Sequence, residues 1–308
     1  MTKKLSLSAL LVVVFLLAAC AGPAGPQEIM ISAKAMQYQP AAQLAATDAA
    51  AGAAWSSTPP EPAPVLVATV ESDGDEWTRT TSYHPRDGWH DHERGELRGF
   101  AEHAHTRDGD NYSSAATVTR HYDLGREDEA RGLQLLEEIT SGPNGVLVRE
   151  LHTLEAEDLA PGVRTTRRIA TDIFHVEAGP EEAAARVRTE WDHDAAGNVT
   201  EERALGRVDT KSGADLPGDE RITTTNYAEP LDPGGPRNLA AEIVVTDGDG
   251  VQVSATRTYY DGEPEQGLAL GQVDRRGLVA RAETWTDGEN WLTSLRQVHD
   301  AHGNTTRI

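Results

Sequence analysis

The pattern of hydrophobic and polar positions along the chain changes near residue 65. Val65 to Val70 form an apolar run of the length of a buried strand, and a two-residue alternation follows from Trp77 to Tyr83. Similar strand-like segments recur over residues 116–122, 145–154, 163–176, 185–191, 239–246, 251–260, 279–286 and 291–299. No comparable helical stripe accompanies them. The pattern therefore predicts an all-β body over residues 65–308.

Turn-forming pairs separate these segments at regular intervals. Asp-Gly, Asn-Gly and Gly-Asn pairs begin at residues 73, 87, 108, 144, 197, 247, 261, 287 and 303. Glycine and asparagine tolerate the positive φ angles of tight hairpin turns, so the pairs indicate antiparallel hairpins that follow one another along the chain. We expect meandering antiparallel hairpins in an open, curved sheet, preceded by a disordered leader.

Two of the predicted hairpins share a sequence. Residues 190–200 and 298–306 both contain Asp-Ala-x-Gly-Asn-x-Thr, which is typical of stacked repeats. From these hairpins and the Asp-Gly pair at 261 we predict a set of structural turn residues: Asp192, Gly197, Asn198, Asp261, Gly262, Asp300, Gly303 and Asn304.

The first twenty residues have the order of a secretory signal. Lys3 and Lys4 precede an apolar run from Ala9 to Ala19, which is too short to span a bilayer. Leu17-Ala18-Ala19-Cys20 resembles the bacterial lipobox, whose family chemistry is diacylglycerol attachment to the cysteine and cleavage before it. We predict a signal peptide over residues 1–19 and lipidation of Cys20, the one cysteine of the chain.

Residues 20–64 are expected to form a lipid-anchored tether. They are rich in Ala and Pro and end in Thr58-Pro59-Pro60-Glu61-Pro62-Ala63-Pro64, and proline at this density disfavours both helix and sheet. A flexible tether of about 44 residues would reach roughly 35–40 Å. A marginal turn or two of helix is open over residues 41–51. Because no Asp follows Cys20, we expect a cell-envelope location, in the outer membrane if the organism is diderm.

The charge balance excludes one class of partner. The chain has 28 basic and 50 acidic residues and a formal net charge of -22, which repels phosphate backbones and anionic lipid. We therefore expect no nucleic-acid binding, and membrane contact through the lipid alone. The 38% of hydrophobic residues, with six Trp and seven Tyr, suffices for a folded body.

The hairpins resemble the YD repeats of the Rhs family. Longer stretches, in the family's order, are similar to the pre-repeat and early repeat region of the B component of insecticidal toxin complexes. They cover residues 83–102, 130–138, 259–262, 270–273 and 277–281, within a resemblance spanning about residues 77 to 308.

This resemblance implies a β-strand shell whose Asp and Gly residues set the turns. In complete family members the shell encloses a C-terminal toxic polypeptide. This sequence departs from the pattern, because Trp191-Asp192 and His299-Asp300 stand where the family has Tyr-Asp, and no self-cleaving core or toxic domain follows. A cargo-carrying role is therefore not expected.

Two histidine pairs are the main candidates for chemistry. His90 with His92 and His103 with His105 each place two imidazoles on one face of a strand, and both pairs across a hairpin could hold a metal. Solvated histidines explain the pattern more simply, so we expect no metal, no cofactor and no catalytic residue. The acidic stretches near residues 73 and 247 lack calcium-loop spacing, and hairpin turns account for them.

Three functions remain open from the sequence. The first is a membrane-anchored, non-catalytic scaffold or interaction module, with a protein partner docked at an exposed sheet edge. The second is a truncated fragment of a polymorphic toxin without a function of its own. The third is a metal-dependent enzyme that uses the histidine pairs.

Overall fold

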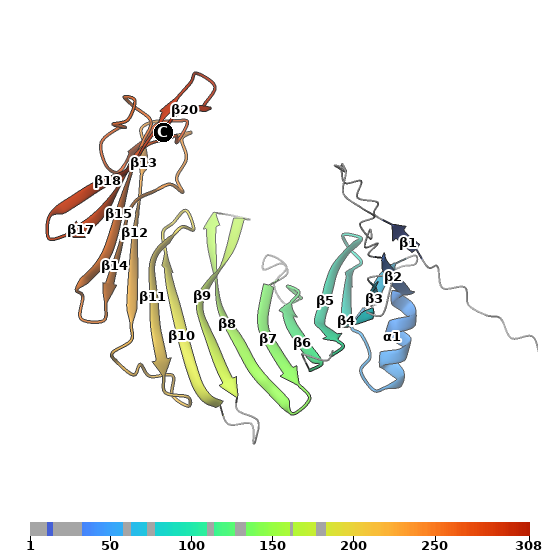
Figure 1. Cartoon of the computed structure of the whole chain (residues 1–308). Coiled ribbons are helices and arrows are strands. Elements are labelled where there is room, and N and C mark those ends of the chain that lie inside the picture. Colours follow the sequence, from blue (N-terminus) through green and yellow to red (C-terminus); the bar gives the residue numbers. More distant parts are fainter. Residues whose placement is uncertain are drawn as a thin grey trace, which may run out of the picture. The chain divides into compact units, whose positions relative to one another are not determined.

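The structure is a computed structural model of the whole chain, and it divides into two compact units. It describes residues 11–14, 33–57, 63–72, 78–109, 114–126, 134–160, 163–176 and 183–308. The first unit comprises Met1–Leu151, Gly162–Thr165 and His175–Glu182, and the second His152–Pro161, Thr166–Phe174 and Ala183–Ile308. Figure 1 shows the elements of both units. The predicted signal peptide and Cys20 fall largely outside the described residues.

The first unit is an antiparallel meander in which each described strand pairs with its neighbours in the sequence. Its strands are β1 (Leu11–Val14), β2 (Ala33–Pro40), β3 (Pro64–Ser72), β4 (Thr78–Asp91), β5 (Glu96–Arg107), β6 (Ala116–Asp123), β7 (Gln134–Gly142) and the start of β8 (Gly145–Ala160). Short turns connect β4 to β5 and β7 to β8, as the alternation of strand-like segments and turn residues predicts.

The second unit is also an antiparallel meander, and two of its longer connections, residues 228–239 and 261–278, lie at the same end of its strands. It contains the rest of β8 and β9 (Val163–Val176), followed by β10 (Ala183–His193), β11 (Val199–Val208), β12 (Arg221–Tyr227), β14 (Ala240–Asp247), β15 (Gln252–Tyr260), β17 (Val279–Asp287) and β18 (Asn290–Arg296) in the sheet. Two short pairs lie beside it: β13 (Glu229–Pro230) with β16 (Gln272–Val273), and β19 (Val298–His299) with β20 (Thr305–Arg307).

The buried core of the second unit is small and lies where these longer connections fold together. Ala228, Ala241, Tyr260 and Val273 form a buried cluster, and Val273 has no exposed surface. The parallel pairing of β13 with β16 brings two of the connections side by side. Most other strand residues are only partly buried. The cluster therefore supplies this end of the unit with its hydrophobic anchor.

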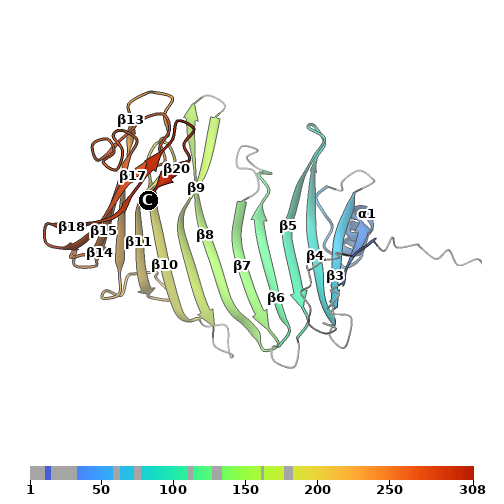
Figure 2. The same ribbon diagram turned by 45° about the horizontal axis from the view of Figure 1, so that its top comes forward.

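A helix and an adjoining segment pack at the start of the sheet. Helix α1 (Ala41–Ala50) follows β2 directly and contacts β2 and β4, and Figures 1 and 2 both draw it beside the first strands. After the helix, Trp55 meets Phe100 edge to face with ring centroids 5.5 Å apart and donates a 2.7 Å hydrogen bond to Asp48. The helical segment thus covers one end of the sheet.

This finding corrects part of the predicted tether. Residues 33–57 were expected to belong to a flexible tether, with at most a marginal turn or two of helix over residues 41–51, but they form β2, α1 and the Trp55 contact. Propensity alone makes a short Ala-rich helix marginal, and packing of Ala41 and Ala45 in buried positions stabilises it here. Ser57 adds hydrogen bonds to both the amide and the carbonyl of His90.

The all-β class and the open antiparallel sheet are confirmed. Strand order follows chain order in the sheet from β1 to β18, with only the two-residue strands outside it. The one described helix is α1. Within the part of the chain that is described, no helix has the length and apolar character needed to span a membrane.

Candidate functional site

An aspartate organises the hairpin between β10 and β11. The Asp194 carboxylate accepts hydrogen bonds from the backbone N–H groups of Ala196 at 2.8 Å and Asn198 at 2.9 Å, and from the Asn198 side chain at 2.9 Å. Gly197 has a φ of +89°, which glycine adopts without the strain that a Cβ would bring. The carboxylate therefore satisfies the donors that the tight turn leaves unpaired.

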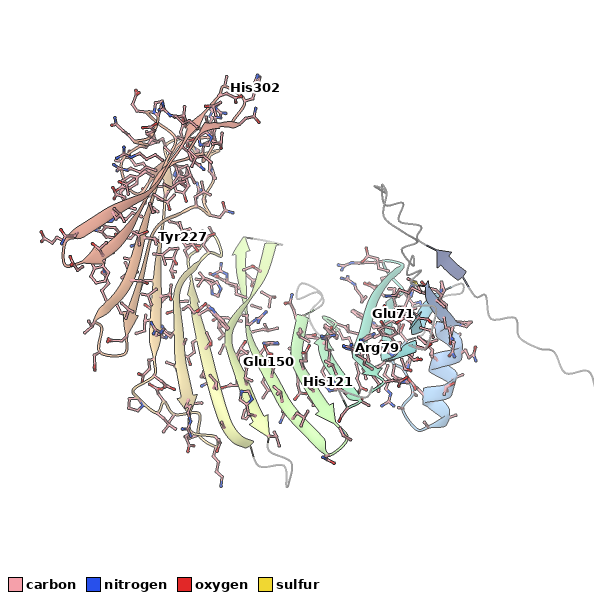
Figure 3. All side chains as sticks on the ribbon, in the orientation of Figure 1. Glu71, Arg79, His121, Glu150, Tyr227 and His302 are labelled. Carbon is pink, nitrogen blue, oxygen red and sulfur yellow. The ribbon has the colours of Figure 1, made fainter. Side chains whose placement is uncertain are left out.

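The hairpin between β19 and β20 repeats this geometry. Asp300 accepts from the N–H groups of His302 and Asn304 and from the Asn304 side chain, at 2.8, 2.9 and 3.0 Å. Gly303 has a φ of +90°. Figure 3 labels His302 at the tip of this hairpin. The hydrogen bonds from Asn304 lower the pKa of Asp300, so its carboxylate stays charged well into acid.

The structure corrects one predicted turn residue. Asp192 was assigned to the first hairpin, but it lies in β10 opposite Glu201 and its carboxylate bonds Arg203 at 2.7 Å. Asp194 holds the turn instead. The shared sequence in fact aligns Asp194 with Asp300 and places His193, rather than Trp191, before the turn aspartate.

A third hairpin of the same kind connects β14 and β15, where the Asp-Gly pair at 247 predicts a turn but the full Asp-Ala-x-Gly-Asn-x-Thr sequence is absent. Asp247 accepts from the N–H groups of Asp249 at 3.1 Å and Val251 at 2.8 Å, and Gly250 has a φ of +80°. The backbone bonds that close it match those of the other two hairpins. Val251 occupies the asparagine position, so this turn lacks the side-chain hydrogen bond.

Replacing Val251 by asparagine is expected to raise the free energy of unfolding by about 0.5–1 kcal/mol. The new amide can donate to the free oxygen of Asp247, as Asn198 and Asn304 do in their hairpins. Val251 is 61% exposed, so little apolar burial is lost. Chemical denaturation followed by tryptophan fluorescence measures the change. Val253→Asn is the control, because Val253 lies in β15 away from any turn aspartate, and an equal gain there would contradict the explanation.

The Asp-Gly pair at 261 differs from these hairpins, because its aspartate bonds a segment farther along the chain rather than its own turn. Asp261 has a φ of 47°, and its carboxylate accepts from the N–H groups of Asp274, Gly277 and Leu278 at 2.9, 3.0 and 3.0 Å. A Cβ added to Gly262 would lie 2.8 Å from backbone atoms of the 267–268 segment. Through these hydrogen bonds, Asp261 holds residues 274–278 of the long connection between β15 and β17 in place, next to Val273 of the buried cluster.

A second recurring feature is a charged face on the second unit, formed by ion pairs between neighbouring strands. Residues two apart on a strand share a face and meet the same face of the next strand. The charged face carries, on β9 to β11, Asp172, Arg186, Arg188, Glu190, Asp192, Glu201 and Arg203. Farther along the sheet, Arg257 bonds Glu242 at 2.8 Å and lies over the Trp291 ring at 3.8 Å.

The most buried ion pairs of this face centre on Asp172. Its two oxygens accept from Arg186 Nε at 2.8 Å and from Arg188 Nη2 at 3.0 Å, and only 7% of its side chain is exposed. Arg203, which is more exposed, donates to Asp192 and Glu201, and these bonds raise its guanidinium pKa. Asp172 therefore joins β9 to β10 and Asp192 joins β10 to β11, whereas Glu201 bonds Arg203 within β11.

The two histidines of the first pair, His90 and His92, lie close together and are hydrogen-bonded to each other. The Nδ1 atoms of His90 and His92 lie 3.3 Å apart, and the rings meet edge to face. His90 is buried, whereas His92 is exposed. Because the separation is that of a hydrogen bond, one imidazole donates and the other accepts.

The second histidine pair lies elsewhere on the same hairpin. The register of β4 with β5 places His90 opposite Leu97 and His103 opposite Pro85, so the two pairs do not face each other. Among the residues that the structure describes, no three His, Cys, Asp or Glu side chains group closely enough to hold a metal ion. The four histidines therefore do not form the joint site that their spacing allows.

His103 and His105 instead line a face with Tyr83 on β4, Arg120 on β6 and Glu138 on β7. Burial lowers the pKa of both imidazoles, and the Arg120 charge lowers them further. Both imidazoles therefore favour the neutral form at pH 7. The neighbouring Arg120 guanidinium donates a 2.5 Å hydrogen bond to Glu138. Figure 3 labels the neighbouring His121 on β6.

Acidification is expected to destabilise the first unit through these two histidines. Their folded-state pKa values lie below the unfolded value of about 6.5, so the unfolded chain binds more protons. Their contribution to stability is full above pH 6.5 and falls as the pH drops toward the folded pKa. Denaturation midpoints between pH 7.5 and 5 measure the slope. The slope should shrink when both are replaced by Gln, but not in His302→Gln, and an unchanged slope in the double variant would exclude this cause.

The sheet also presents an edge at β18. In the strand order of the described residues, β18 pairs with β17 alone. Its residues alternate between exposed and partly buried, and Leu292 is 62% exposed. Unpaired backbone groups on such a strand can accept a strand from another polypeptide.

Comparison with known proteins relates the fold to toxin-complex chains. No family model and no curated protein matches the sequence. Among solved structures, the crystal structure of TcdB2-TccC3 matches with a TM-score of 0.61 and 13% identity, covering 84% of this chain and 18% of that chain. The TcdB2-TccC3 structure without the hypervariable C-terminal region gives 0.62 and 14%, covering 83% and 17%. The chain thus shares a toxin-complex-like all-β fold over less than a fifth of those longer chains.

Proposed function

We propose, from this likeness in fold, that the chain is a non-catalytic β-shell scaffold that is lipid-anchored in the cell envelope and docks a protein partner at its sheet edge. The observation that carries the proposal is β18, whose outer side has no partner strand among the described residues. A partner that adds an antiparallel strand would satisfy its backbone groups. The exposed Leu292 side chain would then be covered.

The roles of the polar side chains support a scaffold rather than an enzyme. Asp194, Asp247, Asp261 and Asp300 each accept backbone N–H bonds that fix a turn or connection. The charged face holds neighbouring strands together through ion pairs between strands. Side chains engaged in this way stabilise the sheet rather than remain available for proton transfer or nucleophilic attack.

Photocrosslinking at the edge tests the docking role. A photoreactive amino acid replaces Leu292 in the full chain, expressed in its own host, and a second variant carries it at Leu136. Leu136 is a matched control, since it is 38% exposed but lies in β7, which is paired on both sides. We expect one crosslinked band of constant size from position 292 and none from position 136. Equal labelling at both positions, or none at either, would argue against an edge partner.

The truncated-fragment alternative predicts a different outcome. An isolated fragment would yield no discrete crosslink and would self-associate through β18 as its concentration rises. Sedimentation of the purified full chain at several concentrations distinguishes the two. A monomer that also crosslinks to one partner supports the scaffold, whereas progressive aggregation without a partner supports the fragment.

Cys20→Ser tests the anchor separately. The wild-type chain should fractionate with membranes and incorporate a labelled fatty acid, and the variant should do neither. Membrane association that persists in the variant without label would refute anchoring through Cys20. It would leave the edge-docking role to be judged by the crosslink.

A further inference from the structure

A cavity lies on the charged face of the second unit. Its volume is about 620 Å³, and residues of β8 to β11 line it, among them Glu155, Arg167, Arg188, Glu190 and Arg203. This volume is within the range of sites that hold small molecules or single peptide side chains. The cavity therefore offers a place where a polar ligand can contact several strands at once.

Two of the three arginines in this cavity have carboxylate partners on the charged face. Arg203 donates to Asp192 at 2.7 Å and to Glu201 at 2.6 Å. Arg188 donates through Nη2 to Asp172 and lies 3.8 Å from Glu190. Their charges are balanced by side chains of the protein, although Arg188 Nε is buried without a partner.

Arg167 differs from both. Its Nη1 atom lies 3.1 Å from Glu157, whose side chain is 53% exposed. Its Nε and Nη2 atoms are buried and have no hydrogen-bond partner. Only 13% of the Arg167 side chain is exposed, so the two unpaired N–H groups sit inside the protein beside the cavity. A buried polar group without a partner calls for a specific explanation.

The two free groups have the geometry of a binding fork. Nε–H and Nη2–H lie on the same side of the planar guanidinium and point in parallel, which matches the two oxygens of one carboxylate. A Cβ built on Gly197 would lie 3.9 Å from Nε, so the fork lies close to the hairpin that Asp194 organises.

We infer that Arg167 binds a carboxylate group of a ligand that enters this cavity. The fork makes two charge-assisted hydrogen bonds, and Arg188, whose buried Nε also has no partner, lines the same cavity. Glu190 and Asp192 are ion-paired with Arg188 and Arg203, which limits their repulsion of an anion. The inference goes beyond the edge-docking role and does not depend on it.

Calorimetric titration of the full chain tests this site. Succinate is the free-acid probe, succinamide its neutral match, and a terminally blocked Ala-Glu-Ala tripeptide presents the same group on a polypeptide. We expect at least one carboxylate probe to bind and succinamide not to bind. Binding of the tripeptide alone identifies a polypeptide ligand, and binding of succinate alone identifies a small organic acid. No binding of either carboxylate at millimolar concentration overturns the inference.

Arg167→Lys is the decisive variant, because it keeps the positive charge beside Glu157 but loses the fork. We expect about tenfold weaker binding or more, from the loss of one charge-assisted hydrogen bond. Arg168→Lys is the control, since Arg168 is exposed and does not line the cavity, although it lies 5.9 Å from the ring centroid of Trp191, which does. Thermal unfolding checks that both variants fold. Unchanged affinity in a folded Arg167→Lys protein would also overturn the inference.

Discussion

Replacing Asp172 by alanine is expected to lower the free energy of unfolding by about 3–5 kcal/mol. This carboxylate is nearly fully buried and bonds two arginines, Arg186 and Arg188, whose side chains are 12% and 24% exposed. Alanine would leave two guanidinium groups with too few acceptors in a poorly solvated place. The Arg186 guanidinium also lies 5.0 Å from the Phe174 ring centre, so it cannot easily move into water.

Denaturant unfolding of the full chain, followed by circular dichroism, measures this loss. Asp192→Ala is the matched control, because Asp192 bonds Arg203 on the same face but its side chain is 57% exposed. Exposed ion pairs contribute about 1 kcal/mol or less. A similar loss in both variants would mean that burial does not determine the strength of these ion pairs.

Asp261→Ala is expected to cost about 2–4 kcal/mol, because three backbone N–H groups lose a charged acceptor. The N–H groups belong to the connection that carries Val273 into the buried cluster. Asp261 also has a positive φ, which alanine tolerates less well than aspartate. We expect the connection between β15 and β17 to detach before the sheet unfolds.

Hydrogen exchange measured by mass spectrometry localises this effect. Peptides from residues 262–278 should lose protection in Asp261→Ala, while peptides from β4 and β5 should not change. Asp274→Ala is the control, since Asp274 is exposed and offers its backbone N–H rather than its carboxylate to this network. Loss of protection throughout the second unit would instead place Asp261 in its cooperative core.

The all-β fold could be predicted because each strand of a meander pairs with its neighbours. Alternation of residues and turn pairs are local signals, and in this topology local order is also spatial order. The small cluster of Ala228, Ala241, Tyr260 and Val273 could not be predicted in the same way. It depends on the parallel contact of β13 with β16, which are separated by more than forty residues.

The site residues were predictable only where they form bonds within a turn. Gly197 and Gly303 have the positive φ that their motif indicates. Asp194 was not predicted, because the Tyr-Asp pattern of the repeat aligns with Trp191-Asp192 and so places the turn aspartate two residues earlier. The charge alternation Arg186, Arg188, Glu190, Asp192 was visible in the sequence, yet it could not reveal the buried partner Asp172 on another strand.

The docking of Trp55 and α1 changes how far the sheet can stand from a membrane. If Cys20 carries a lipid, as proposed, only twelve residues lie between it and the first residue of β2. A chain of that length spans at most roughly 45 Å even when fully extended. The segment after Cys20 would therefore keep the first residue of β2 within that distance of the bilayer. Inserting residues between Cys20 and β2 would increase the distance from the bilayer that the sheet, and with it the docking edge at β18, can reach.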